Sequence, residues 1–303
     1  MKIKNLLSVF LSFCLCFCLI GCGEENAADN SKLQVYTSFY GVYDLVSKIG
    51  GDKIQVYNIV PAGTEPHSWE PTSGDMLSLS GGDILFFNGA GMESWVDKVQ
   101  TALESENLKY VMLSEGTELI GSEDSTATDP HIWLNPLNAK KEAEIIKNAL
   151  SDEDPLNADY YSENYEVFAE KADELDSAFK DMISKAVNKT IVVAHEAYGY
   201  LCEAYGIEQL AVEGLSADSE PSPAKMAEIS AFIKDNNIKY IFFEELLPTK
   251  AADVIAEETG AELLVLNPFE GLTEDDIASG ADYFSVMYEN LENIKKAVGQ
   301  KEY

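Results

Sequence analysis

The sequence predicts an α/β protein of two βα lobes, each with a mainly parallel sheet, joined by a long rigid helix. Three observations predict this fold. Short apolar runs of strand length alternate with amphipathic stretches of helix length, which is typical of parallel sheets with helical crossovers. The alternation stops once, near the middle of the chain, and then starts again. The 303 residues, 46% of them hydrophobic, are enough for one large domain or two of ordinary size.

Strands and helices alternate regularly before the interruption. After the first strand, Val42, Leu45 and Ile49 recur at helical spacing, and the pair Gly50-Gly51 predicts where that helix ends. The same alternation continues to residue 150. The expected strands are 32–36, 54–60, 83–87 and 110–113, and the expected helices are 40–49, 92–103 and 137–150.

The interruption is a stretch of helix formers at residues 157–187 that contains no Gly and no Pro. Apolar side chains recur in it every three or four residues and so define one face of a helix. At 1.5 Å per residue this helix is about 45 Å long and would connect the two lobes. Two shorter helices are the alternative. The apolar positions are Tyr161, Tyr165, Phe168, Ala172, Leu175, Phe179 and Met182.

The alternation then restarts and runs to the end of the chain. Ligands of such sheets bind outside the carboxyl ends of the strands, so we expect the site in the cleft between the lobes. The expected strands are 190–194, 209–212, 239–243 and 263–266, and the expected helices are 197–205, 223–236, 251–258 and 282–298. The expected segments are a signal peptide (1–21), a flexible tether (22–31), an N-terminal lobe (32–155), the connecting helix (156–187) and a C-terminal lobe (188–303).

The N-terminus has the pattern of a secretory signal. Lys2 and Lys4 precede an apolar run at residues 6–20, which is too short for a membrane span, and small Gly21 precedes Cys22. This end resembles a bacterial lipoprotein signal, in which Cys22 would carry the lipid; ordinary cleavage with a free Cys22 is the alternative. We therefore expect an extracytoplasmic protein that is lipid-anchored to the bacterial cell membrane.

Charge and cysteine content limit the possible ligands. The chain has 53 acidic and 21 basic residues, for a net charge of −32, and every basic residue is Lys. A nucleic-acid partner is excluded on this basis, and without Arg an anionic substrate is disfavoured. A cation is the more natural ligand, although a solubilising acidic surface explains most of the charge. Beyond Cys22 only Cys202 remains, so neither an internal disulfide nor a thiolate metal site is expected.

The three histidines have a distribution typical of a metal site. His67 and His195 follow the strand-like runs 54–60 and 190–194, and His131 lies on a loop bounded by prolines. A single histidine at a strand end is usually structural. Two histidines after strands and a third on a proline-bounded loop, with none on a helix face, point to one shared site. Imidazoles suit Zn²⁺.

A fourth zinc ligand would normally be a carboxylate, since cysteine is absent. Glu270, which follows the strand-like run 263–266, is the first candidate, and Glu244, which follows 239–243, is the second. Either of them could instead be a solvated acid. Glu65 and Glu244 are also candidates to support the ligands from outside the coordination shell.

Two competing motifs are incomplete. Asn88-Gly89-Ala90-Gly91 is similar to a dinucleotide-binding turn, but Ser94 replaces the third glycine, so we predict a tight βα turn. His195-Glu196 begins like a zinc-protease motif, but Gly199 stands where the second histidine is required.

From Lys32 to the end, the chain resembles the zinc and manganese solute-binding lipoproteins of bacterial metal ABC transporters, especially the zinc branch. The matching motifs are PHSWEP (66–71), GAGMESW (89–95), DPHIW (129–133), AH (194–195) and NPFEGLT (267–273). The resemblance implies a metal held between the lobes by His67, His131 and His195. His195 and Asn267 stand where the manganese branch has carboxylates, which favours zinc and implies that Glu270 is the fourth ligand. The histidine-rich loop of many zinc members is missing at residues 121–128.

The resemblance implies a monomeric binding protein, not an enzyme, that captures zinc and delivers it to a cognate ABC permease. Three alternatives remain. The protein could serve manganese or another divalent metal, or it could act as an adhesin. It could also be a secreted zinc hydrolase in which Glu65, Glu244 or Glu270 is the general base.

Overall fold

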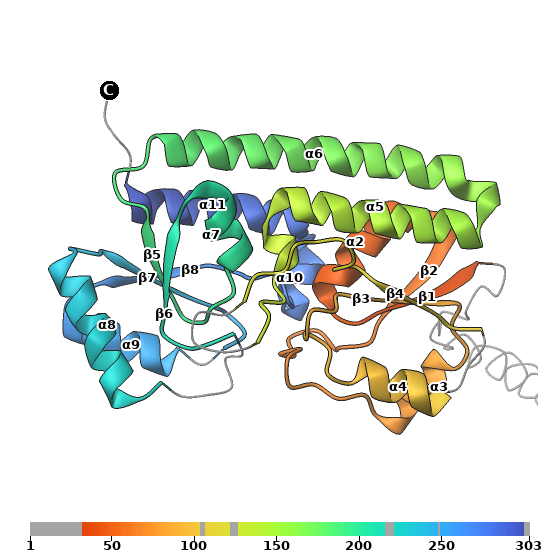
Figure 1. The fold of residues 1–303 in the computed structure, drawn as a ribbon, viewed down its shortest axis with the longest axis horizontal. Helices are drawn as coiled ribbons and strands as arrows, with labels where there is room; N and C mark the ends of the chain where they lie inside the picture. Colours follow the sequence, from red (N-terminus) through yellow and green to blue (C-terminus); the bar gives the residue numbers. More distant parts are fainter. Residues whose placement is uncertain (1–31, 104–106, 122–126, 216–220, 248, 300–303) are drawn as a thin grey trace, which may run out of the picture. The chain divides into compact units, whose positions relative to one another are not determined.

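Two four-stranded sheets contain the strands of the described residues (Figure 1). The computed structural model describes residues 32–103, 107–121, 127–215, 221–247 and 249–299. The sheet orders are β2-β1-β3-β4 and β6-β5-β7-β8, and every pair of neighbours is parallel. The predicted α/β fold is therefore confirmed. The strands are β1 (Leu33–Thr37), β2 (Ile54–Asn58), β3 (Ile84–Phe87), β4 (Lys109–Met112), β5 (Thr190–Val193), β6 (Glu208–Ala211), β7 (Tyr240–Phe243) and β8 (Glu262–Val265).

Helices connect the strands and cover both sheets. We call the first sheet with α2 to α5 the first lobe, and the second sheet with α7 to α10 the second lobe. The helices are α2 (Tyr40–Gly50), α3 (Ser73–Leu79), α4 (Val96–Leu103), α5 (Pro136–Glu153), α6 (Ala158–Ser184), α7 (Gly199–Tyr205), α8 (Pro223–Asp235), α9 (Lys250–Thr259), α10 (Glu274–Ser279) and α11 (Tyr283–Val298). Within the described ranges, no helix has both the length and the apolar composition needed to cross a membrane.

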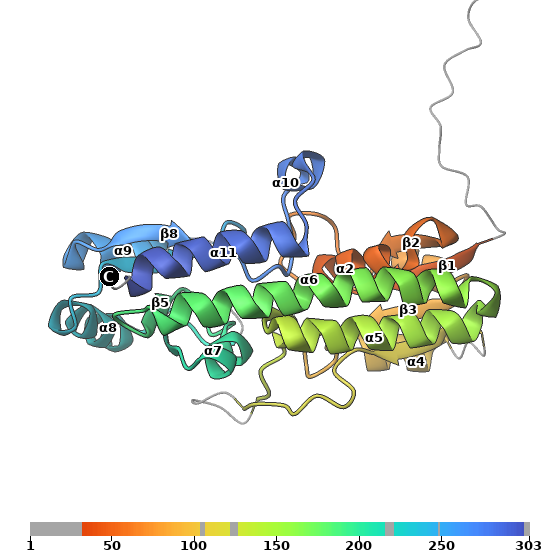
Figure 2. The ribbon, with the colours of Figure 1, turned by 90° about the horizontal axis from the view of Figure 1, so that it is seen from above.

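The long helix α6 is one continuous element of 27 residues, so the alternative of two shorter helices was wrong. Its predicted apolar positions are buried except for the partly buried Tyr165, and Phe168, Leu175 and Phe179 are almost fully inaccessible. It packs against α5 and α2 of the first lobe and against α7 of the second, and α11 lies beside it (Figure 2). At 1.5 Å per residue α6 is about 40 Å long, enough to contact both lobes.

Two short helices were not predicted. α3 and α10 are too short to show a hydrophobic period, but each begins with a capping box. Thr72 with Asp75 caps α3, and Thr273 with Asp276 caps α10. These local hydrogen bonds, rather than an apolar face, start both helices.

The helix predicted from residue 92 begins four residues later, at Val96. The turn before it is held by the carboxylate of Glu93, which accepts from the backbone N–H groups of Asn88 and Gly89, both at 2.9 Å. Gly89 and Gly91 have φ values of 80° and 93°, which glycine adopts without strain. The segment is therefore the tight βα turn that its sequence predicts.

The core is shared between the two lobes. One apolar cluster extends from β1 and α2 through α5 and α6 to α11 and the second sheet. Smaller clusters, which include Val99 of α4 and Ile229 of α8, fill the opposite face of each sheet. Both sheets are thus buried on two faces, as parallel sheets require.

Phe179→Ala should lower the free energy of unfolding by about 3–5 kcal/mol, because Phe179 is fully buried on α6 and stacks on Tyr205 at 4.9 Å. Val167→Ala is the matched control on the same helix. Val167 is 56% exposed, and its truncation should cost no more than about 0.5 kcal/mol. Urea denaturation measures both values, and equal losses would contradict the role assigned to the buried face of α6.

Candidate metal centre

The structure brings together four predicted site residues from four separate segments. His67 lies on the loop after β2, and His195 lies two residues beyond β5. His131 precedes the 3-10 turn Ile132–Leu134, and Glu270 lies on the loop after β8. Three of the four therefore follow the carboxyl end of a strand, where parallel sheets bind their ligands.

One atom of each residue points to a common centre. The Nε2 atom of His131 lies 3.2 Å from that of His67 and 3.3 Å from that of His195. Glu270 Oε1 lies 2.8 Å, 3.4 Å and 3.6 Å from the Nε2 atoms of His131, His67 and His195. All four atoms lie within 4.8 Å of one another. Ligands about 2.0–2.1 Å from a tetrahedral Zn²⁺ are about 3.3 Å apart, so these spacings fit that ion.

The four side chains are shielded from water. His131 and His195 are fully buried, Glu270 is 6% exposed and the His67 side chain 9%. Burial alone would raise the pKa of Glu270, but His67 and His131 beside it hold that pKa well below its usual range. Glu270 is therefore an ionised acceptor in a nearly closed centre.

Asp129 holds the other ring nitrogen of His131. Its Oδ1 atom lies 2.8 Å from His131 Nδ1 and accepts from the His131 backbone N–H at 2.9 Å. This contact directs Nε2 to the common centre. Burial lowers the pKa of His131, but hydrogen bonds to Asp129 and Glu270 raise it to about 10. Asp129 was not among the predicted site residues, and its place two residues before His131 was the only available signal.

Glu244 contacts the Nδ1 atom of His195 as Asp129 contacts that of His131. Its Oε1 atom lies 2.5 Å from His195 Nδ1, on the side of the ring away from the common centre. Burial raises the pKa of Glu244, and the pKa of His195 is raised by Glu244 although burial opposes it. Glu244 therefore contributes none of the four converging atoms. It instead contacts the far side of the His195 ring.

Glu65 contacts the backbone rather than an imidazole. Its carboxylate accepts from the N–H of His67 at 2.9 Å and from the N–H and hydroxyl of Ser68 at 3.2 Å and 3.1 Å. Together with Pro66, these bonds order the loop that carries His67.

The loop that carries Glu270 has a strained conformation that its neighbours stabilise. Phe269 has φ 59°, which is rare for a bulky residue, and its N–H donates to Asn267 Oδ1 at 2.8 Å. Asn290 of α11 accepts from Asn267 N–H at 2.9 Å and donates to Asn267 O at 2.7 Å. Asn267 therefore shapes the loop, and the Glu270 carboxylate reaches the common centre.

Comparison with known proteins gives consistent matches. Residues 35–297 match the family described as zinc-uptake complex component A, periplasmic. The chain is 35% identical to the high-affinity zinc uptake system protein ZnuA of Bacillus subtilis, over 93% of this chain and 95% of that protein. It is also 35% identical to the zinc-binding lipoprotein AdcA of Streptococcus pneumoniae, over 98% of this chain but only 62% of AdcA.

Solved structures show the same fold. The Zn(II)-bound ZnuA-like domain of pneumococcal AdcA matches with a TM-score of 0.80 and 36% identity, over 89% of this chain and 100% of that domain. The laminin-binding protein Lmb of Streptococcus agalactiae matches with a TM-score of 0.82 and 29% identity, over 88% and 100% of the two chains. Lmb is described as bifunctional, with adhesin and metal transporting activity.

In the metal-free protein, His131 should remain protonated at pH 8, where an ordinary imidazole is neutral. Because its pKa is raised in the folded state, its contribution to folding stability is fully present below pH 6.5 and is lost as the pH rises towards about 10. An NMR titration of the ¹⁵N-labelled imidazoles measures this directly, with the urea-unfolded chain as the control. Titration of folded His131 near pH 6.5 would contradict the contacts described.

Proposed function

Because this chain belongs to the zinc-uptake complex component A family, we propose that it captures Zn²⁺ outside the cytoplasmic membrane and delivers it to an ABC permease for import. The observation that carries this proposal is the convergence of three Nε2 atoms and one carboxylate oxygen, in a shielded centre, at the spacing of a tetrahedral ion. The names of ZnuA and AdcA support the same cargo.

The donor set favours zinc over the manganese alternative. Mn²⁺ is bound mainly by oxygen ligands, often six of them, whereas three imidazoles and one carboxylate suit four-coordinate Zn²⁺. Asn267 further supports this choice, because its side-chain Oδ1 accepts from the Phe269 N–H and its backbone N–H donates to Asn290.

The same geometry argues against a hydrolytic reaction. A catalytic zinc keeps one position open for water, whereas four donors from His67, His131, His195 and Glu270 would fill every position of a tetrahedral ion. Glu65, one of the possible bases, is engaged with the His67 loop.

The cobalt-substituted protein should therefore have a tetrahedral d–d spectrum and no exchangeable water, because the four protein donors leave no open position. Detection of such a water would favour the hydrolase.

Lipid anchoring is part of the proposal. Cys22 and residues 1–31 lie outside the described residues. Their sequence pattern, together with the lipoprotein name of AdcA, supports an anchor at the membrane.

We further propose that the protein acts as a monomer and that its lobes have the boundaries 32–155 and 188–303. Docking on the permease would then separate the ligands so that the ion leaves. Adhesion, known here only from the description of Lmb, stays an untested alternative.

Zinc titration against a competing chelator tests the proposal. Glu270→Gln should weaken zinc binding by about a hundredfold or more, since a structural zinc site is worth about 10–16 kcal/mol and one of four ligands loses its charge. Glu245→Gln is the matched control, because Glu245 is an exposed acid beside Glu244 and is not among the converging residues. A wild-type protein that binds no zinc would refute the proposed function, and equal affinities of the two variants would refute the role of Glu270.

A further inference from the structure

Gly199, the first residue of α7 in the second lobe, lies directly against Asp129 of the first lobe. A Cβ atom at position 199 would overlap Asp129 Oδ2 and would lie 2.8 Å from Ile120 Cδ1. The backbone of Gly199 is not left-handed, so its own conformation does not require glycine. Glycine is required at this position because the Asp129 side chain of the first lobe occupies the space that a Cβ atom would need.

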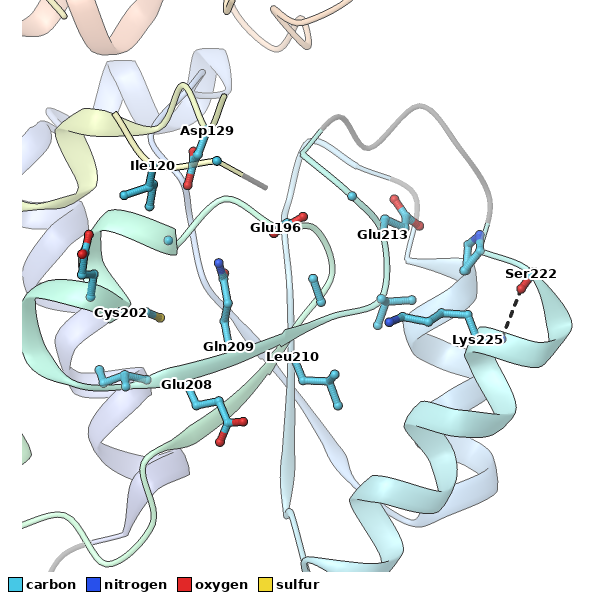
Figure 3. A pocket seen from close by; sticks show the side chains of 18 residues that line it. Ile120, Asp129, Glu196, Cys202, Glu208, Gln209, Leu210, Glu213, Ser222 and Lys225 are labelled. Carbon is cyan, nitrogen blue, oxygen red and sulfur yellow. Dashed lines mark hydrogen bonds between the residues drawn. The ribbon is translucent and has the colours of Figure 1, made fainter. Parts of the chain in front are cut away.

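A second residue of α7 holds the same segment. The hydroxyl of Tyr200 donates to Asp129 O at 3.0 Å and accepts from Ile120 N–H at 3.2 Å. The Asp129 N–H in turn donates to Ile120 O at 2.9 Å. Figure 3 shows Asp129 and Ile120 near each other at one end of the pocket beside β6, close to the helix that carries Cys202.

Asp129 has little room to move away from a larger side chain at position 199. It is 2% exposed, and its Oδ1 atom is committed to the backbone N–H and the ring Nδ1 of His131. A Cβ atom against Oδ2 would therefore displace the whole carboxylate and weaken its hold on His131. The small size of Gly199 therefore affects His131 through the Asp129 carboxylate.

We propose that Gly199 is a positioning residue for the metal centre: by leaving space for the Asp129 carboxylate, it allows α7 of the second lobe to fix the orientation of His131 in the first. This inference rests on the proposed zinc function. It also gives the lobes a mechanical link to the ion, because a shift of α7 relative to Ile120 and Asp129 would loosen His131 without breaking a metal bond first.

The test is a double-mutant cycle of Gly199→Ala and Asp129→Ala in the full chain, read out by zinc competition titration. Gly199→Ala should weaken zinc binding about 10- to 100-fold, the usual effect of disturbing a residue behind a metal ligand. Asp129→Ala should weaken it to a similar extent. The double variant should bind no more weakly than Asp129→Ala alone, because removal of the carboxylate makes room for the new methyl group.

Gly214→Ala is the matched control, since a Cβ atom at that position meets no other described residue within 4 Å, its two chain neighbours aside, and its φ is not left-handed. It should change zinc affinity by less than about twofold. A second readout needs no metal: Gly199→Ala should speed hydrogen exchange of the His131 amide, which donates to Asp129, and Gly214→Ala should not.

Two results would overturn the inference while leaving the proposed function intact. One is wild-type zinc affinity in Gly199→Ala. The other is a double variant whose loss is the product of the two single losses, which would mean that Gly199 and Asp129 act independently. If Gly199→Ala does not fold, the double variant decides: a double variant that folds and binds like Asp129→Ala supports the inference, and one that also fails to fold overturns it.

Discussion

Three carboxylates and three imidazoles are buried together around one point, and the rest of the structure depends on keeping their charges balanced. Asp129, Glu244 and Glu270 are each less than a tenth exposed. Buried anions are stable only beside compensating positive charge. In the metal-free protein protonated His131, whose pKa is raised to about 10 although burial opposes it, supplies such a charge, and the pKa of His195 is raised as well. A divalent cation would supply this positive charge instead, so metal binding would release protons from the imidazoles.

The scaffold keeps these groups in place by joining both lobes to shared elements. α6 and α11 each pack against parts of both lobes. Trp133 Nε1 donates to Pro268 O, and the hydroxyl of Tyr283 donates to Trp133 O, both at 2.7 Å. The first bond ties the segment after His131 to the loop of Glu270, and the second ties the same segment to α11, so residues far apart in sequence lie in fixed positions relative to each other.

The fold and the four converging residues could be predicted from the sequence because they follow from periodic patterns and from strand ends. Apolar alternation placed every strand and the long helix to within a few residues, and histidines after strands were expected to share one site. Glu65 and Glu244 were expected to support the site, but the remaining supporting contacts were harder to predict. No periodicity indicates that Asp129 turns its carboxylate onto His131, and Gly199 was considered only as the residue that breaks a protease motif. The first contact depends on the conformation of one loop, and the second depends on packing between the lobes. α3 and α10 were missed for a related reason, since their capping boxes act over only four residues.

The most direct test of the central claim is a crystal structure of the zinc-loaded protein, with anomalous diffraction recorded on both sides of the zinc absorption edge. We predict one zinc peak bonded to Nε2 of His67, His131 and His195 and to one oxygen of Glu270, at about 2.0–2.2 Å, with no water in the coordination shell. A peak elsewhere, or a water molecule in place of any of these four ligands, would contradict it.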